Sequence, residues 1–259
     1  DDTPGLGSPV IPGLLALLCH REFARVTGLH REHLSSAVVV AGILAATVLT
    51  LLAVRPQTLT LTHAATLVAL CLLNVLPDRP SGYIRRVALA AGSFMLFGVG
   101  LGRLAHFPDL PLPDYRPLVC VLIACVQLND VFAYCCGRAL APRLGNAKWF
   151  STTSPGKTVA GHLGAIALTT PLAAWLLSLA LAGTPLAQPV HLAALALIIA
   201  VGGQLGDLVI SSVKRDVGVK DMGALLPGHG GVLDRCNSLL LVIPVVYHYT
   251  RQVLESSPT

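Results

Sequence analysis

The sequence predicts an all-α, polytopic integral membrane protein with about seven transmembrane helices, whose polar loops on the cytoplasmic side form the functional site. The chain of 259 residues is 54% hydrophobic and only 12% charged. Soluble domains usually contain about 25% charged residues. Mean hydropathy is +0.71, and several apolar runs approach the ~20 residues that cross a bilayer. A soluble domain with a large core is the alternative, and the shortage of charge argues against it.

Residues 1–36 form an N-terminal segment ahead of the first complete span. Within it, residues 10–18 are apolar but too short to cross a bilayer, and Arg21, Arg25 and Arg31 follow them. An apolar run followed by cations is typical of a helix that lies in the membrane interface. The remnant of a longer helix is the alternative, since the chain begins without Met and further N-terminal helices are compatible with that start.

Seven apolar segments are candidate spans. They cover residues 37–54, 59–76, 84–102, 117–137, 159–182, 190–213 and 238–254. The last is the weakest, because Pro244, His248 and Arg251 interrupt it. We assign residues 37–116 to a group of N-terminal transmembrane helices and residues 117–259 to a second transmembrane domain that contains the polar motifs.

The distribution of basic residues predicts the orientation. With the N-terminus inside, the outer segments keep only Arg55, Arg103, Arg116 and Arg251 of the 18 Lys and Arg. Basic residues are enriched in cytoplasmic loops, so seven spans with the N-terminus inside and the C-terminus outside are predicted. Both polar loops then face the cytoplasm. The net charge of +5 is too small to indicate a nucleic-acid partner, and none is expected.

The stretch of residues 204–238 contains the main cluster of charge. On a helix, Asp207 and Ser211 share one face with Lys214 and Arg215. Asp207 lies about two turns inside an apolar run, where a carboxylate is costly unless it meets a cation, a metal or water. This position predicts a functional role.

A glycine-rich loop follows that helix. Residues 226–231 read LPGHGG, which contains too many helix breakers to be helical and allows close approach of the backbone to a ligand. Asp234 and Arg235 come directly afterwards. Two acids, fixed cations and a glycine loop together predict a site for a polyphosphate and a metal.

A second polar loop covers residues 137–161. The span before it contains Asp130, and the loop contains Ser154-Pro155-Gly156-Lys157-Thr158. This is half of a phosphate loop, but Ser151 stands where the full pattern needs Gly and no strand precedes it, which excludes a Walker-type NTPase. A Lys and a Thr at the start of a helix still suit anion binding.

These motifs resemble those of a known family. Residues 211–215, Lys220-Asp221 and residues 226–235 are similar to the signature of phosphatidate cytidylyltransferases (CDP-diacylglycerol synthases). Residues 130–138 and 154–161 resemble the family's two upstream motifs, in the expected order. The resemblance covers roughly residues 117–250, and the N-terminal third agrees only in being hydrophobic. Residues 117–259 are therefore expected to be the catalytic domain, with the cytoplasmic polar loops forming its active site.

Two positions depart from the family pattern. The signature usually closes as DRxD, whereas this chain has Asn237 in place of the second acid. The upstream loop usually reads SPxKTxEG, and Ala160 stands where the Glu would be. Asn keeps an oxygen acceptor but loses a charge, so we expect a change in metal affinity or substrate preference.

The resemblance implies a Mg²⁺-dependent nucleotidyltransferase. It would join CTP to phosphatidic acid, giving CDP-diacylglycerol and pyrophosphate, at the cytoplasmic face of a bacterial inner membrane. The attacking phosphate is already largely ionised near neutral pH, since its second pKa is about 6, so no strong base is needed. Mg²⁺ and fixed cations would do the work by positioning and electrostatics. CTP, phosphatidic acid, the lipid bilayer and a second copy in a homodimer are the implied partners.

The resemblance also implies roles for particular residues. Asp207 and Asp234 would hold the catalytic Mg²⁺, and Asp130 would bind a second cation such as K⁺ or orient the nucleotide. Lys214 and Arg215 would act in catalysis by clamping phosphates. The remaining predicted substrate-binding residues are Ser154, Lys157, Thr158, Ser211, Lys220, Asp221, His229, Gly230 and Arg235.

Other functions remain open at the level of sequence. Another CTP-dependent lipid enzyme, either a CDP-archaeol-type synthase or a polyprenol kinase, would use similar chemistry. An ion-coupled transporter could place Asp130 and Asp207 on an ion path, although the polar residues gather at one predicted surface. Because Asn237 replaces an acid of the family signature, a family member without catalytic activity, retained as an interaction scaffold, is a further alternative. The acids could instead belong to a structural network of salt bridges. Lys214 and Arg215 could simply anchor the helix end at the cytoplasmic membrane surface, as basic residues commonly do.

Overall fold

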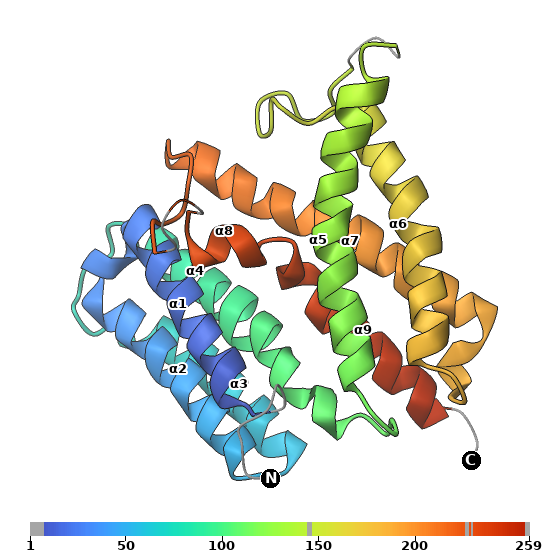
Figure 1. The fold of residues 1–259 in the computed structure, drawn as a ribbon. Helices are drawn as coiled ribbons and strands as arrows, with labels where there is room; N and C mark the ends of the chain where they lie inside the picture. Colours follow the sequence, from blue (N-terminus) through green and yellow to red (C-terminus); the bar gives the residue numbers. More distant parts are fainter. Residues whose placement is uncertain (1–7, 144–146, 226–227, 229, 257–259) are drawn as a thin grey trace. The chain divides into compact units, whose positions relative to one another are not determined.

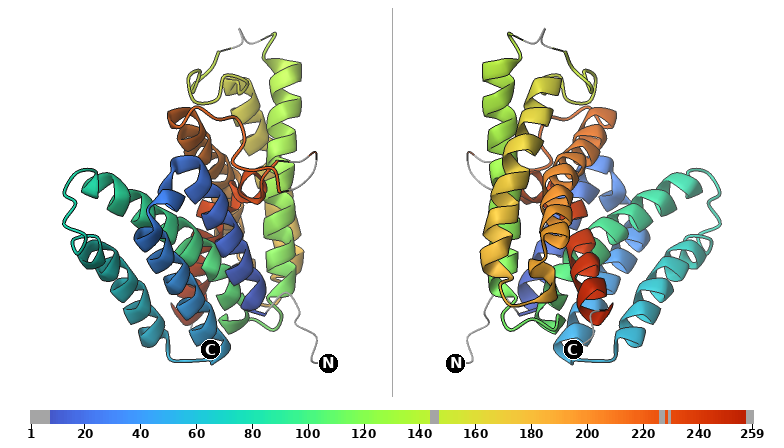
Figure 2. Two further views of the ribbon diagram at one scale, coloured as in Figure 1. Left: turned by 90° about the vertical axis from the view of Figure 1, so that its left-hand side faces the viewer. Right: turned by 90° about the vertical axis from the view of Figure 1, so that its right-hand side faces the viewer.

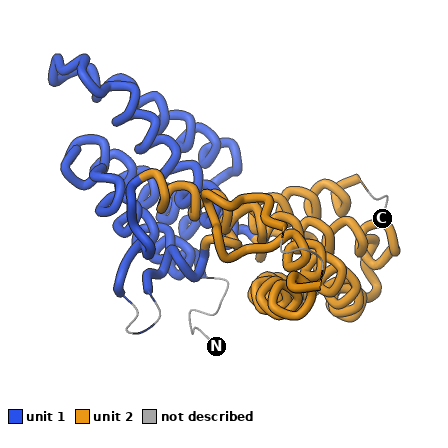
Figure 3. Tube along the Cα trace, turned by 90° about the horizontal axis from the view of Figure 1, so that it is seen from above, with its two compact units in different colours: residues 1–106, 217–236 blue, residues 107–216, 237–259 orange. Residues whose placement is uncertain are grey.

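The computed structural model describes residues 8–143, 147–225, 228 and 230–256. These residues form helices joined by loops, and the described chain contains no β-strand (Figure 1). The predicted all-α class is confirmed. Two compact units divide the chain, the first with residues 1–106 and 217–236 and the second with residues 107–216 and 237–259 (Figure 3).

The helices follow one another along the chain with short connections. In order they are α1 (Val10–Thr27), η1 (Leu29–Arg31), α2 (His33–Leu51), α3 (Pro56–Leu73), α4 (Tyr83–Ser93), η2 (Phe94–Gly100), η3 (Leu101–Asp109), α5 (Arg116–Leu140), α6 (Val159–Ala180), η4 (Pro185–Ala187), α7 (Pro189–Asp216), α8 (Val232–Cys236) and α9 (Leu239–Ser256). The predicted division at residue 116 stays a prediction, and the compact units group the signature segment 217–236 with the N-terminal helices.

Local sequence explains where several helices begin and end. Pro56 stands at the start of α3, where the missing N–H costs nothing and the fixed φ suits a helix. Thr158 caps α6, because its hydroxyl accepts a hydrogen bond from the N–H of Gly161 at 3.1 Å. Gly28 ends α1 with a φ of +81°, a left-handed conformation that glycine adopts without a steric penalty.

Six described helical segments are long and apolar enough to cross a membrane. They are His33–Leu51, Pro56–Leu73, Tyr83–Asp109, Arg116–Leu140, Val159–Ala180 and Pro189–Asp216, and each matches one of the predicted spans. The segment predicted as the seventh span forms α9, which is not among the six. Pro244, His248 and Arg251 lie within α9 and lower its apolar content, so a seventh crossing stays a prediction.

The distribution of side chains is that of a protein in lipid. Large apolar residues point outward, as at Leu76 and Ile84, whose exposed fractions are 73% and 82%. Polar residues are buried between helices, as where Ser35 donates to Asn74 at 2.8 Å. Interhelical hydrogen bonds of this kind are typical of membrane bundles, whose outer surface is covered by lipid tails as apolar as the side chains. The chain is an integral membrane protein.

In the first unit, α1 packs against α2 and the helical segment of α4 and η2. Phe23 of α1 meets Phe97 of η2 edge to face, with ring centroids 5.7 Å apart. Ile43 and Phe94 are buried in the same core. Aromatic pairs in this geometry add to the energy of burial, so α1 is an integral part of the unit's core.

In the second unit, α5, α6, α7 and α9 pack together, and α5 and α6 lie side by side along most of their length (Figure 2). A methyl group added at Gly161 of α6 would lie only 2.6 Å from the carbonyl oxygen of Ala133 and 3.2 Å from the Cα of Gly137. Small residues at this crossing allow the two backbones to approach closely. The beginning of α6 is thereby fixed against the end of α5.

We expect buried His20 of α1 to make the first unit sensitive to acid. Its Nδ1 is 2.8 Å from the hydroxyl of Ser93 and its Nε2 is 3.0 Å from that of Ser36, and burial lowers its pKa to about 4. The unfolded chain has the ordinary pKa near 6.5, so it binds more protons between pH 6.5 and 4. The free energy of unfolding is therefore highest, with respect to His20, above pH 6.5. It falls by roughly 3 kcal/mol as the pH is lowered to about 4.

We expect the melting temperature in detergent to fall between pH 7 and pH 4.5, and His20→Gln to reduce that fall. Gln can hydrogen-bond both serines but does not titrate in this range. His30→Gln is the control, because His30 is exposed. Equal pH dependence in wild type and His20→Gln would contradict the assignment.

Candidate functional site

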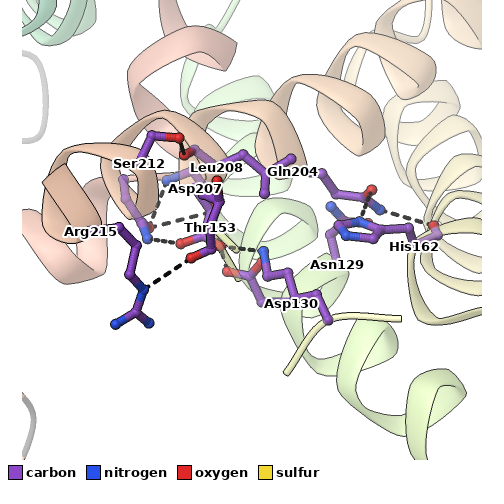
Figure 4. A network of polar contacts seen from close by, with 12 residues as sticks. Asn129, Asp130, Thr153, His162, Gln204, Asp207, Leu208, Ser212 and Arg215 are labelled. Atoms are coloured by element: carbon purple, nitrogen blue, oxygen red, sulfur yellow. Dashed lines mark hydrogen bonds and ion pairs between the residues drawn. The ribbon is translucent and has the colours of Figure 1, made fainter. Parts of the chain in front are cut away.

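Asp207 of α7 is the centre of a polar network in the second unit. One carboxylate oxygen is bonded to the ammonium group of Lys157, which precedes α6, and the other accepts from the side-chain amide of Asn237 (Figure 4). The carboxylate inside the apolar run therefore meets a cation and an amide, as its cost in a membrane requires. Segments 50 and 30 residues away in the chain converge on this one side chain.

Asp130 of α5 lies beside this network (Figure 4). Its carboxylate accepts from the hydroxyl of Ser238 at 3.3 Å, and its charge interacts with those of Asp207 and Lys157. The neighbouring Asn129 donates to the carbonyl of Ala200 at 2.9 Å and is completely buried. This bond between α5 and α7 fixes the turn of α5 that presents Asp130.

Close packing holds Asn237 against α7. A methyl group at Gly206 would lie 2.6 Å from the carbonyl oxygen of Asn237, so only glycine allows the turn of residues 237–238 to approach the helix this closely. The side-chain oxygen of Asn237 accepts from the N–H of Ser238 at 2.7 Å. That bond orients the amide nitrogen toward Asp207.

The cationic end of α7 holds the loop before α6. The guanidinium of Arg215 donates to the carbonyl of Thr153 at 3.1 Å, which ties the loop that contains Ser154 and Lys157 to α7. Lys214, the residue just before Arg215 in the helix, is partly buried. The loop before α6 and the charged end of α7, two separately predicted motifs, are thus bonded to each other.

The signature segment forms a second polar group, in the first unit. Asp234 lies in the first turn of α8, and its Oδ2 accepts from the N–H groups of Met222 at 2.8 Å and Gly231 at 3.1 Å. Gly230 adopts a φ of +81° between them, which favours glycine. Asp234 therefore joins Met222 to Gly231, the two ends of the signature loop (residues 222–231).

Glu22 of α1 is a further carboxylate at this loop. Its side chain is 6% exposed, and its two oxygens accept from the N–H groups of Val232 at 3.0 Å and Leu233 at 2.8 Å. These N–H groups lie in the first turn of α8 and have no partner within the helix itself, and a negative charge is favourable at that end. Glu22 anchors the signature loop to the N-terminal helix.

The predicted site residues fall into the two units. The second unit contains Asp130, Ser154, Lys157, Thr158, Asp207, Ser211, Lys214 and Arg215, and the first contains Lys220, Asp221, Gly230, Asp234 and Arg235. His229 lies outside the described residues. Within the second unit the structure brings Asp130, Lys157 and Asp207 together, and in the first it joins Asp234 to the backbone near Asp221.

The second unit can hold a divalent ion. Asp130 and Asp207 supply hard carboxylate oxygens at one place, and Mg²⁺ is usually bound through one or two carboxylates together with substrate phosphates and water. No group of three or more His, Cys, Asp or Glu that could hold a metal occurs among the described residues. The donor set therefore fits an ion that is completed by a phosphate ligand better than a closed structural site.

Several residues of these networks were not predicted as site residues. Glu22 is 210 residues from its partner Val232, and no local pattern connects them. The side-chain oxygen of Gln204 accepts from Nδ1 of the buried His162 ring at 2.7 Å, and Thr169 donates to Asn129 at 2.9 Å. For the last four residues, the available signal was a polar side chain within an apolar segment.

Comparisons with known proteins support the same family. Residues 8–253 match the model of the cytidylyltransferase family, so the match includes the N-terminal third. Phosphatidate cytidylyltransferases of Bacillus subtilis and Synechocystis sp. are similar to this chain. The first is 38% identical over 159 residues, 60% of this chain and 56% of that protein. The second is 37% identical over 178 residues, 66% of this chain and 57% of that protein.

An uncharacterized protein of Escherichia coli K12, YnbB, is 35% identical over 184 residues, which are 69% of this chain and 58% of that protein. The chain thus spans a little over half the length of these curated relatives. Because the family model covers almost all of the described residues, the chain belongs to the cytidylyltransferase family.

Proposed function

We propose that this protein transfers the cytidylyl group of CTP to phosphatidic acid, giving CDP-diacylglycerol and pyrophosphate. The convergence of Asp130, Lys157 and Asp207 from three segments of the second unit carries the proposal. A cation and two acids at one place suit a reaction between two polyanions. The relatives named phosphatidate cytidylyltransferase favour phosphatidate over an isoprenoid acceptor.

In this proposal Lys157 and the loop before α6 bind the phosphates of CTP. Lys157 precedes the N-terminus of α6, where the first backbone N–H groups and the helix dipole favour an anion. Thr158 caps that helix through its oxygen, so its hydroxyl hydrogen stays available to a phosphate. Arg215 keeps the loop in place through Thr153, which gives it a positioning role, and Lys214 adds positive charge beside it.

Mg²⁺ is the proposed cofactor, held by Asp207 and Asp130 in the second unit. When bound it would neutralise charge that develops on the α-phosphate and the leaving pyrophosphate. The chain's own residues orient the nucleotide and leave the phosphate oxygen of the acceptor, already ionised, as the nucleophile. The predicted roles of Asp234 as a metal ligand, of Ser154, Ser211, Asp221, His229, Gly230 and Arg235 as substrate-binding residues, and of K⁺ as a second cation stay predictions.

The proposed location is a bacterial cytoplasmic membrane with the site facing the cytoplasm. Basic residues cluster in the loops that contain the site motifs, and CTP is a cytoplasmic nucleotide that a membrane-embedded enzyme must reach from that side. A homodimer is also proposed from the resemblance. Reaction of a membrane-impermeant thiol reagent with a single cysteine placed at Ser151, in sealed inverted vesicles but not in right-side-out cells, would support this orientation.

One assay tests the proposed function. The purified chain in detergent is given radiolabelled CTP, phosphatidic acid and Mg²⁺, and labelled CDP-diacylglycerol is separated by thin-layer chromatography. We expect product only when all three are present, and loss of product when EDTA is added. Product from a polyprenol instead of phosphatidic acid would replace this proposal with the kinase alternative, and absence of product from any lipid would contradict it.

Replacement of Asn237 by Asp tests how the departure from the family signature affects the site. The amide of Asn237 donates to Asp207, whereas a carboxylate there cannot donate when ionised and places a third negative charge near Asp130 and Asp207. We expect Asn237→Asp to lower the Mg²⁺ concentration for half-maximal activity by about three- to tenfold, since one added charge contributes on the order of 1 kcal/mol. An unchanged or higher half-maximal concentration would show that Asn237 does not tune the metal site.

A further inference from the structure

The first unit contains a cleft of about 700 Å³ between α1 and the signature segment. One wall is the face of α1 that presents Leu18, Arg21 and Arg25, and the other is formed by residues 220–225. Both walls belong to the same compact unit. The cleft therefore links the N-terminal helix, which carries none of the predicted site residues, to the signature.

Three cations line this cleft. Arg21 and Arg25 are one helical turn apart and share a face of α1, and Lys220 approaches from the opposite wall. All three are exposed, and no ion pair joins them to another residue in the described part of the chain. Cations that surround a concave surface without carboxylate partners are suited to bind an anion.

Two acids also line the cleft, but one of them is already engaged. Both oxygens of Glu22 accept hydrogen bonds from α8, so its carboxylate is directed to the signature loop. Asp221 belongs to the wall of residues 220–225 and is exposed to solvent. The cleft therefore keeps an excess of positive charge, and Glu22 ties its α1 wall to the start of α8.

The remaining lining is apolar. Leu18 and Val26 of α1 and Leu225 of the opposite wall contribute aliphatic surface, and none of the described lining residues is aromatic. A nucleotide base usually stacks on aromatic side chains, and this cleft offers none. Paired arginines beside aliphatic surface instead match an amphiphile with a charged head and hydrocarbon chains.

We propose that this cleft receives the phosphomonoester head group of the lipid acceptor, with Arg21, Arg25 and Lys220 on the phosphate and the aliphatic residues on the glycerol and the first methylenes. This rests on the proposed function and adds the acceptor's binding place. A phosphomonoester has a charge of about −1.5 to −2 near neutral pH, and guanidinium groups bind it bidentately. Arg21 and Arg25 become specificity-determining residues, because a phosphodiester lipid has less charge and fewer free oxygens.

The double variant Arg21→Gln/Arg25→Gln tests the proposal in the 259-residue chain in detergent. With short-chain dioctanoylphosphatidic acid as the acceptor, we expect its KM to rise by about tenfold or more, since each bond to a charged group contributes on the order of tenfold. The KM for CTP should stay within about twofold. Arg21→Lys/Arg25→Lys should recover part of the loss, because Lys keeps the charge but not the bidentate geometry.

A matched control removes the same charge elsewhere. Arg31 and Arg85 are also exposed basic residues of the first unit and do not line the cleft. Arg31→Gln/Arg85→Gln should leave both KM values within about twofold of wild type. A rise in the KM for phosphatidic acid that is equal in the two double variants would mean that the arginines only attract anionic lipid to the surface, and would overturn the proposal.

A binding measurement separates this inference from the proposed function. Native mass spectrometry of the wild-type chain should show more bound dioctanoylphosphatidic acid than dioctanoylphosphatidylcholine, and Arg21→Gln/Arg25→Gln should abolish that preference. Arginine-dependent binding without turnover would support the cleft and contradict the transferase proposal. If Arg21→Gln/Arg25→Gln turns over with unchanged KM for phosphatidic acid and unchanged lipid binding, the transferase proposal is supported and the cleft proposal is contradicted. An increase in the KM for CTP alone would assign the cleft to nucleotide phosphates and overturn the inference.

Discussion

Asp207→Ala is expected to lower the rate of CDP-diacylglycerol formation by about a thousandfold or more while the protein still folds. The carboxylate of Asp207 bonds to Lys157 and to Asn237, so its loss removes a proposed metal ligand and releases a cation and an amide at once. Loss of one hydrogen-bond donor that stabilises developing charge typically costs 10²–10³ in rate, and loss of a residue that holds the metal should cost at least as much.

Asp216→Ala is the matched control for Asp207→Ala. Asp216 is the last residue of α7 and is exposed, so it removes the same charge from the same helix outside the network. The rate should be measured at saturating CTP and phosphatidic acid, and Mn²⁺ binding should be followed by electron paramagnetic resonance. Near-normal turnover or undiminished Mn²⁺ binding in Asp207→Ala would contradict the proposed role of Asp207.

Glu22→Ala should have the second-largest effect, through the signature loop. It leaves the N–H groups of Val232 and Leu233 without their acceptor. Hydrogen bonds to a charged group are each worth about 1.5–3 kcal/mol, so the attachment of the loop to α1 should weaken by roughly 3–6 kcal/mol. We expect turnover to fall by about tenfold to a hundredfold, because Asp234 and Lys220 would no longer be held in place.

Hydrogen–deuterium exchange gives a readout of this effect that does not depend on activity. Peptides from residues 217–236 should exchange faster in Glu22→Ala, whereas those from α2 should not change. Glu32→Ala is the control, because it removes the same charge from the same unit at a carboxylate that makes only a long ion pair of 3.9 Å with Arg86 and does not contact α8. Equal exchange of residues 217–236 in the two variants would refute the anchoring role.

The helical class and six of the seven predicted spans agree with the structure, because each depends on local composition. Runs of apolar residues near Pro and Thr caps define the helices, and the same runs define the lipid-facing surface. The charged end of α7 was also predictable, since Asp207 is unfavourable in an apolar run unless it has a partner. Sequence alone named Lys157 and Asp207 separately, through their motifs, and the structure bonds them to each other.

Other parts of the site depend on contacts between distant segments. Glu22 appears in the sequence as one acid among arginines, and only the packing of α1 against α8 gives it two amides. Gly206 appears as an ordinary small residue of an apolar helix, and its role follows from the 2.6 Å that separates a methyl group there from the turn at Asn237. No local periodicity encodes such pairings.

The bond between Glu22 and the amide of Val232 also constrains how the protein is made. The two residues are separated by 210 positions, so α1 enters the membrane region long before its partner segment has been synthesised. Until then the buried carboxylate has to be satisfied by water or lipid head groups, and contacts of such long range form late in folding. Truncation before residue 232 should therefore leave the N-terminal helices inserted but vulnerable to membrane quality-control proteases.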